Sequence, residues 1–208
     1  MLDAIIFDVD GTIWDSTEQV SEAWTETVQN HASKSFVITP EEFRKTFGKT
    51  MDVFCSMILA PLSPEEQSVI SDLGLKNEVT YLKKHPGVLY PGVYETLQQL
   101  SKKVPLYIVS NCQCGYVETC IETTGLKPFI SGHLCNGETD LPKAETLHML
   151  ISRYDLKDVV YVGDTSDDAG QCKKAGIPFV WASYGFGQYP EAERTIHSMS
   201  ELPEVLGL

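Results

Sequence analysis

The chain has 208 residues, enough for one domain or for a core with a smaller insert. Its 29 acidic side chains outnumber its 16 lysines and arginines, and the net charge of −13 disfavours binding to nucleic acid or to an anionic membrane surface. No stretch approaches the roughly 20 apolar residues of a membrane span, and no leader precedes the first predicted strand, so we expect a cytoplasmic protein.

The first predicted element is a buried strand that ends in two carboxylates. The apolar run of residues 4–7 has the β-branched content of an interior strand in a parallel sheet, and Asp8 and Asp10 follow it. Such sheets bind ligands at the carboxyl ends of their strands. Two carboxylates about 4 Å apart repel each other by about 4 kcal/mol at an effective dielectric constant of about 20. A bound cation or a shared proton is therefore expected, although Asp-Gly is also a common turn.

Residues 16–85 contain helix signals but no convincing interior strand. Ser16 with Gln19 is typical of a capping box, and residues 39–42 and 63–66 each combine a capping hydroxyl, a proline and a glutamate. A further helix is predicted over residues 72–84, interrupted or restarted near Gly74. We therefore expect a helical cap over residues 15–86, hinged at residues 14–16 and 85–89, and a core made of residues 1–14 and 87–208.

From residue 87 onward, predicted helices and strands alternate. This alternation predicts an α/β fold with a doubly wound parallel sheet and right-handed crossovers. The expected helices cover residues 91–103, 115–124, 168–175 and a segment opened by Lys143, and the expected strands cover residues 105–110, 130–135, 159–163 and 177–182. The Gly-Phe-Gly loop at residues 185–187 lacks the spacing of a nucleotide-binding loop.

Three later segments also place polar groups where they could meet an anion or a metal. Ser110 and Asn111 end one strand, Asp164 ends another, and Asp168 follows one helical turn later. Lys143 opens a helix, where its charge adds to free backbone amides. Each of these segments is a weak signal alone, but their order along the chain is hard to obtain by chance.

The pattern Asp8-x-Asp10-Gly-Thr12 resembles the first signature of the haloacid dehalogenase superfamily of phosphotransferases. Ser110, Lys143 and Gly163-Asp164 stand in the order of the other three signatures, so the resemblance covers nearly the whole chain. It implies a Rossmann-like core with a smaller all-helical cap inserted after the first strand. One departure is Lys143-Ala144, where many relatives have Lys-Pro.

The resemblance also implies a chemistry, that of a Mg²⁺-dependent phosphatase acting on a small phosphorylated metabolite. Asp8 would attack phosphorus to form an aspartyl phosphate, and Asp10 would act as the general acid and base. The metal ligands would be Asp8, the backbone carbonyl of Asp10, and Asp164. Asp168 is preferred to Asp167 for completing the site.

The remaining residues implied by the resemblance would bind the substrate. Thr12, Ser110, Asn111 and Lys143 are the expected phosphate-binding residues. Lys49, in the turn of residues 47–50, is the candidate cap contact, although a solvated lysine is about as plausible there. We expect no partner beyond the small phosphorylated metabolite, with neither nucleic acid nor membrane, and a monomer or weak homodimer.

Several alternatives remain at this stage. Asp10 argues against the dehalogenases of the superfamily, which lack this second acid. The overall layout most resembles phosphoglycolate phosphatase-like proteins, and a sugar-phosphate mutase of the β-phosphoglucomutase type is the second choice. A non-catalytic binding protein on the same fold is the third. The six cysteines are expected to be reduced thiols, with Cys112 and Cys114 incidental to function.

Overall fold

The structure is a computed structural model that describes residues 2–208. Its centre is a six-stranded parallel sheet in the order β5-β4-β1-β6-β7-β8. The strands are β1 (Ala4–Phe7), β4 (Leu106–Ser110), β5 (Ile130–Cys135), β6 (Val159–Gly163), β7 (Phe179–Ala182) and β8 (Thr195–Ile196). The predicted doubly wound α/β fold is confirmed, although β8 was not foreseen.

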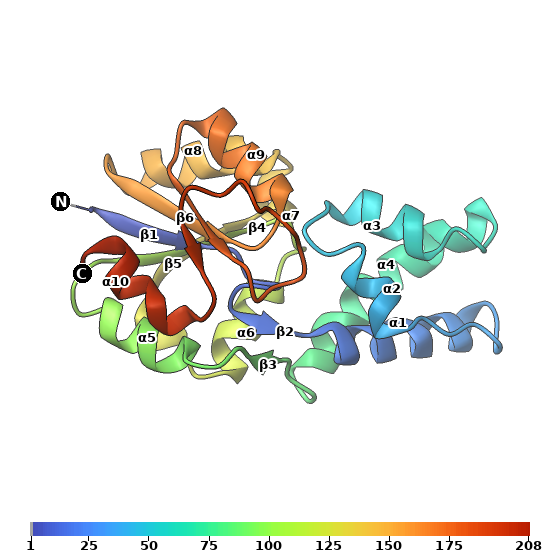
Figure 1. The fold of residues 1–208 in the computed structure, drawn as a ribbon. Coiled ribbons are helices and arrows are strands. Elements are labelled where there is room, and N and C mark those ends of the chain that lie inside the picture. Colours follow the sequence, from blue (N-terminus) through green and yellow to red (C-terminus); the bar gives the residue numbers. More distant parts are fainter. Residues whose placement is uncertain (1) are drawn as a thin grey trace.

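Helices cover both faces of this sheet, and alternate residues of β1 explain why. Ile5 and Phe7 pack in the core beneath α5 (Val93–Leu100) and α6 (Tyr116–Thr123) (Figure 1). Ala4 and Ile6 pack on the other face beneath α8 (Lys143–Arg153) and α9 (Ser166–Ala175). A strand buried on both faces needs an unbroken apolar run, and residues 4–7 provide one. This part also contains α7 (Asn136–Thr139) and α10 (Leu202–Leu206).

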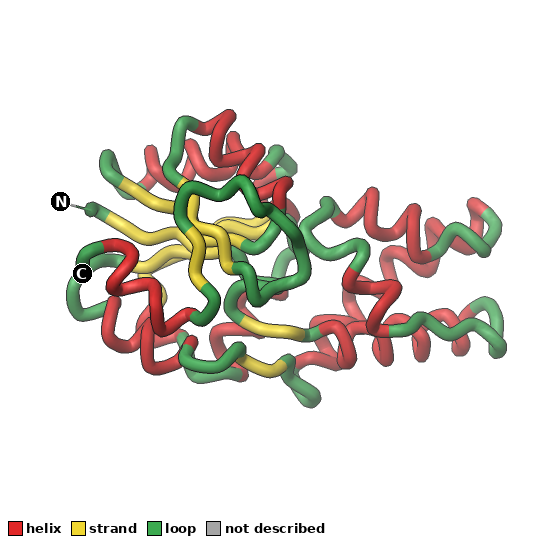
Figure 2. The backbone as a smooth tube through the Cα atoms, viewed as in Figure 1, coloured by secondary structure: helices red, strands yellow, loops and turns green. Residues whose placement is uncertain are grey.

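Four further helices lie beyond the carboxyl ends of the strands (Figure 1). They are α1 (Thr17–His31), α2 (Pro40–Arg44), α3 (Met51–Ile58) and α4 (Pro64–Leu82). Both connections to them pass through a small antiparallel pair, β2 (Trp14–Asp15) and β3 (Val88–Leu89), as Figure 2 shows. We call α1–α4 the helical unit.

Two predictions within the helical unit are wrong. Helix α4 runs unbroken through Gly74, where a Cβ atom would lie 2.5 Å from the ring of Trp24. This glycine therefore allows α1 and α4 to pack closely and does not end a helix. Ser16 makes no capping bond, because its hydroxyl lies 2.7 Å from the Tyr116 hydroxyl, and Asp15 accepts from the Thr17 amide at 2.9 Å instead.

The other two predicted capping boxes are present, at Thr39 with Glu42 and at Ser63 with Glu66. The helix expected from residue 168 begins at Ser166, because the Thr165 side chain caps it. No helix among residues 2–208 has the length and apolar character needed to cross a membrane.

Candidate active site

Three buried carboxylates meet where β1 and β6 end. Asp8 follows β1, Asp164 follows β6, and these strands are neighbours in the sheet. Asp168 joins them from the first turn of α9, and one side-chain oxygen of each residue lies within 4.8 Å of the others. The parallel sheet therefore brings together residues that are more than 150 positions apart.

Lys143 inserts its ammonium group among these carboxylates. It is buried at the start of α8, with Nζ 2.6 Å from Asp168 Oδ1 and 3.1 Å from Asp8 Oδ2. Burial alone would lower the pKa of Lys143, but the charges of Asp168 and Asp8 raise it above its ordinary value. Lys143 therefore stays charged, yet one lysine cannot balance three carboxylates.

Asp164 has one oxygen that is held and one that is free. Its Oδ2 accepts from the amides of Phe186 at 2.6 Å and Gly187 at 3.3 Å, whereas its buried Oδ1 has no hydrogen-bond partner. Burial and the nearby charges of Asp168 and Asp8 raise the pKa of Asp164. A buried acidic cluster with a free carboxylate oxygen suits a divalent cation that prefers oxygen ligands. Asp8 and Asp164 would hold it directly, and Asp168 completes the cluster beside them.

Asp168 and Asp167 differ in their contacts and in their distance from the carboxylate cluster. Both oxygens of Asp168 are already engaged, Oδ1 with Lys143 and Oδ2 with the amide and hydroxyl of Thr165. Asp167 is exposed and pairs with Lys49 across 3.9 Å. Of the two acids that the sequence left in competition, only Asp168 joins the carboxylate cluster.

Asp10 points toward the helical unit. Its Oδ1 accepts from Tyr116 Oη at 2.6 Å, from Trp14 Nε1 at 3.0 Å and from Ser16 Oγ at 3.3 Å. Burial, opposed by the Tyr116 hydrogen bond and assisted by the charge of Asp8, raises the pKa of Asp10 to about 7. A carboxyl group with such a pKa can both donate and accept a proton near neutral pH.

The expected phosphate-binding residues lie around the same strand ends. Ser110 ends β4, which is the other neighbour of β1, and Thr12 is buried with an unpartnered hydroxyl. Asn111 has a contact that the sequence did not indicate. Its Nδ2 donates to the Gly48 carbonyl at 2.7 Å, which links the core to the helical unit. Phe47 stacks on Phe186 of the core, with ring centroids 5.3 Å apart.

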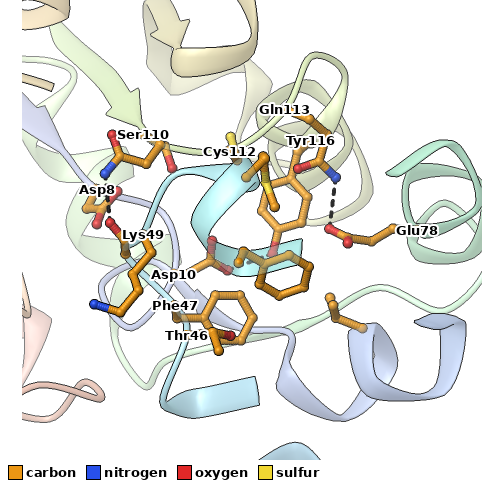
Figure 3. A pocket seen from close by; sticks show the side chains of 15 residues that line it. Asp8, Asp10, Thr46, Phe47, Lys49, Glu78, Ser110, Cys112, Gln113 and Tyr116 are labelled. Atoms are coloured by element: carbon orange, nitrogen blue, oxygen red, sulfur yellow. Dashed lines mark hydrogen bonds between the residues drawn. The ribbon is translucent and has the colours of Figure 1, made fainter. Parts of the chain in front are cut away.

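A small cavity of about 30 Å³ lies between the core and the helical unit. Its wall includes Asp8, Asp10 and Ser110 from the core, and Phe47, Lys49 and Glu78 from the helical unit (Figure 3). This free space is large enough for only one or two water molecules. The helical unit thus lies over Asp8 and Asp10 with little free space between them.

Sequence reasoning missed Glu78, Gln113 and Tyr116, which line this cavity. One signal could have identified Glu78. The buried residues of α4 recur every four positions, as Ile70, Gly74, Glu78 and Leu82, so the glutamate stands within the buried stripe of the helix. Cys112 lies in the cavity wall and Cys114 is exposed, and all six cysteines are free thiols.

This chain belongs to the haloacid dehalogenase-like hydrolase family, whose model matches residues 5–182. It is 26% identical over 221 residues to a phosphoglycolate phosphatase of Vibrio parahaemolyticus, covering 98% of this chain and 96% of the relative. It is also 26% identical to a phosphoglycolate phosphatase of Rhodobacter capsulatus, covering 99% and 97% of the two chains. The predicted phosphatase class within this superfamily is confirmed.

Solved structures agree with this fold. A Haemophilus somnus protein described as a predicted phosphoglycolate phosphatase superposes with a TM-score of 0.83 at 19% identity, covering 99% of this chain and 98% of that one. CbbY from Rhodobacter sphaeroides, solved in complex with phosphate, gives a TM-score of 0.79 at 19% identity over the full length of both chains.

Proposed function

We propose that this protein is a Mg²⁺-dependent phosphatase that hydrolyses a small phosphorylated metabolite through an aspartyl phosphate on Asp8. The observation that carries the proposal is the meeting of Asp8, Asp164 and Lys143 at the strand ends, with Asp10 directed toward the cavity on the other side. The names of the relatives, which are phosphoglycolate phosphatases, support a small substrate.

In this proposal the phosphate lies against the buried carboxylate cluster. The bound cation, held by Asp8, Asp164 and the carbonyl of Asp10 with Asp168 behind them, would offset negative charge on the phosphate and on Asp8. Lys143, Ser110, Thr12 and the amide of Asn111 would bind the phosphoryl oxygens. These hydrogen bonds and the lysine charge would stabilise the transition state of phosphoryl transfer more than the bound ester.

Asp10 would handle the protons of both half-reactions. In the first, an oxygen of Asp8 attacks phosphorus while Asp10 donates a proton to the departing ester oxygen. In the second, Asp10 takes a proton from the water that attacks the phosphorus of the aspartyl phosphate, and Asp8 is released as a carboxylate. The hydrogen bonds from Trp14, Ser16 and Tyr116 orient Asp10 for both steps.

The helical unit would serve as a cap that opens to admit the substrate. The free space of about 30 Å³ is too small for a phosphate ester, so the cap would hinge near residues 15 and 86, next to the pair of β2 and β3. Closing would exclude bulk water from the reacting groups. Lys49, in the turn that touches the core, is the proposed cap contact with the substrate.

The test measures phosphate release from p-nitrophenyl phosphate. Activity is expected with Mg²⁺, absent with a chelator, and weak with Ca²⁺, whose looser coordination positions the reacting atoms less well. Mass spectrometry of the quenched reaction should find a phosphoryl group on the peptide that contains Asp8. Full activity in chelator would overturn the metal requirement. Isomerisation of a sugar phosphate without phosphate release would favour the mutase alternative.

A further inference from the structure

Glu78 is a buried carboxylate for which the proposed mechanism has no use. It lies on the inner side of α4 with 3% of its surface exposed, and it lines the cavity that Asp10 faces (Figure 3). Its Oε2 accepts from the indole of Trp24, and its Oε1 accepts from Gln113 Nε2 at 2.9 Å. None of the ion pairs found among residues 2–208 includes Glu78. A buried carboxylate without a cation is costly, and one beside a substrate cavity indicates a ligand.

Gln113 supplies an unpaired hydrogen-bond acceptor beside Glu78. Because its amide nitrogen is bound to Glu78, its carbonyl oxygen Oε1 remains, and this buried oxygen has no hydrogen-bond partner. The residue is 8% exposed and lines the cavity. A buried acceptor left without a donor is destabilising, so a ligand that donates a hydrogen bond here would relieve that cost.

The other groups around this end of the cavity do not offset its charge. The Tyr116 hydroxyl is already committed to Asp10. Lys49 stands on the Asp8 side of the cavity, its ammonium directed away from Glu78 (Figure 3), and it lies 3.9 Å from Asp167. Burial raises the pKa of Glu78 to about 7. Above that pH the ionised carboxylate makes this end of the cavity repel anions and attract hydrogen-bond donors.

We propose that Glu78 and Gln113 form the subsite for the leaving group and select phosphate esters that carry a hydroxyl or ammonium donor there, against esters that carry a carboxylate. The proposal rests on the proposed phosphatase function and names its substrate class. The class departs from phosphoglycolate, on which the named relatives act, because phosphoglycolate would place a carboxylate against Glu78. Like charges brought together in a desolvated site discriminate strongly.

The experiment compares three esters of equal length that differ only in the terminal group: 2-hydroxyethyl phosphate, 2-aminoethyl phosphate and 2-phosphoglycolate. With Mg²⁺ at pH 8, kcat/KM for the hydroxyl or ammonium ester is expected to exceed that for 2-phosphoglycolate at least about tenfold. A preference for the ammonium ester would show that the charge of Glu78 contributes to substrate recognition. Equal kcat/KM values for the hydroxyl and ammonium esters would show that only the hydrogen-bond donor is recognised. A wild-type enzyme that uses 2-phosphoglycolate as well as either ester overturns the proposal.

A variant then assigns the preference to Glu78. In Glu78→Gln the Gln113 amide can turn so that its oxygen accepts from the new side chain. The ratio of kcat/KM for 2-phosphoglycolate to that for 2-aminoethyl phosphate is expected to rise at least about tenfold. Glu65→Gln, the same change at an exposed position of α4, should leave this ratio unchanged. An unchanged ratio in Glu78→Gln overturns the role of Glu78.

Hydrolysis of p-nitrophenyl phosphate separates the two proposals. Failure of the wild-type protein to release phosphate from any ester, including this one, would overturn the phosphatase function and the subsite with it. Hydrolysis of p-nitrophenyl phosphate together with a preference for 2-phosphoglycolate would overturn the subsite alone.

Discussion

The two ends of the cavity are built in different ways. At the proposed phosphate end, Ser110 ends β4 and Asp8 directly follows β1, with Asp164 nearby at the end of β6, so the backbone of one parallel sheet fixes their positions. At the leaving-group end, Glu78 comes from the helical unit and Gln113 from the loop before α6, and they meet through side chains. In the proposed mechanism the reacting groups therefore belong to the sheet, whereas the proposed selectivity depends on a contact between the helical unit and the core. Changes at the first end should abolish turnover, and changes at the second should alter preference.

The largest effect is expected from Asp8→Asn at the phosphate end. The change keeps the size of the side chain but removes the proposed nucleophile, so turnover of p-nitrophenyl phosphate should fall by several orders of magnitude while circular dichroism shows an intact fold. Asp72→Asn, at an exposed position of α4, is the matched control. If a tenth of the turnover survived in Asp8→Asn, the nucleophile would be another residue.

Asp10→Asn lies between the two ends and should have the next largest effect. The backbone carbonyl remains but proton transfer is lost, so kcat for an alkyl phosphate should fall by about 10²–10⁴-fold. The loss should be smaller with p-nitrophenyl phosphate, whose leaving group needs no proton, and phosphorylated Asp8 should accumulate. A large loss of Mg²⁺ affinity in this variant would instead mean that the Asp10 side chain binds metal.

At the leaving-group end, the burial of Glu78 should appear in the pH dependence of stability. The folded-state pKa is raised to about 7 from 4.5, so the folded protein holds this proton more tightly than the unfolded chain does. Wild-type stability should therefore fall relative to Glu78→Gln as the pH rises from about 4.5 to 7. The relative change is about 3 kcal/mol in the free energy of unfolding. Urea denaturation of both proteins at pH 5 and pH 8 measures it, and an equal difference at both pH values would contradict it.

The smallest effect is expected from Lys49→Met on the cap turn. The exposed pair with Asp167 contributes up to about 1 kcal/mol to stability. Loss of the proposed contact with the substrate should raise KM by less than about tenfold with little change in kcat. Lys45→Met, which removes an exposed pair with Glu41 nearby, is the control and should leave KM unchanged. Identical kinetics for the two variants would remove Lys49 from the site.

The same contrast explains what could be predicted from the sequence. The sheet could be predicted because an apolar run marks each central strand, and the carboxyl ends of parallel strands converge. That rule alone brings Asp8, Ser110 and Asp164 together. The meeting of Glu78 with Gln113 depends on how α4 packs against α1 and α6, which no local pattern determines.

The wrong predictions have the same physical origin. Glycine often marks a helix break, but Gly74 lies within α4, where its lack of a side chain leaves room for the ring of Trp24 on α1. Ser16 has the sequence of a helix cap, but Tyr116 and Asp10 compete for its hydroxyl. The strands β2, β3 and β8 have two residues each, too few for any periodicity.

The hydrogen bonds that orient Asp10 also determine when, relative to closure of the helical unit, the reaction can begin. Two of its three donors, Trp14 and Ser16, belong to the connection between the core and the helical unit, and only Tyr116 belongs to the core. Bending this connection would carry two donors away from the carboxyl group. We therefore expect the Asp10 carboxyl group to be correctly oriented only while the helical unit is closed over the core. An ester bound to the open form would not react until closure restores the hydrogen bonds from Trp14 and Ser16.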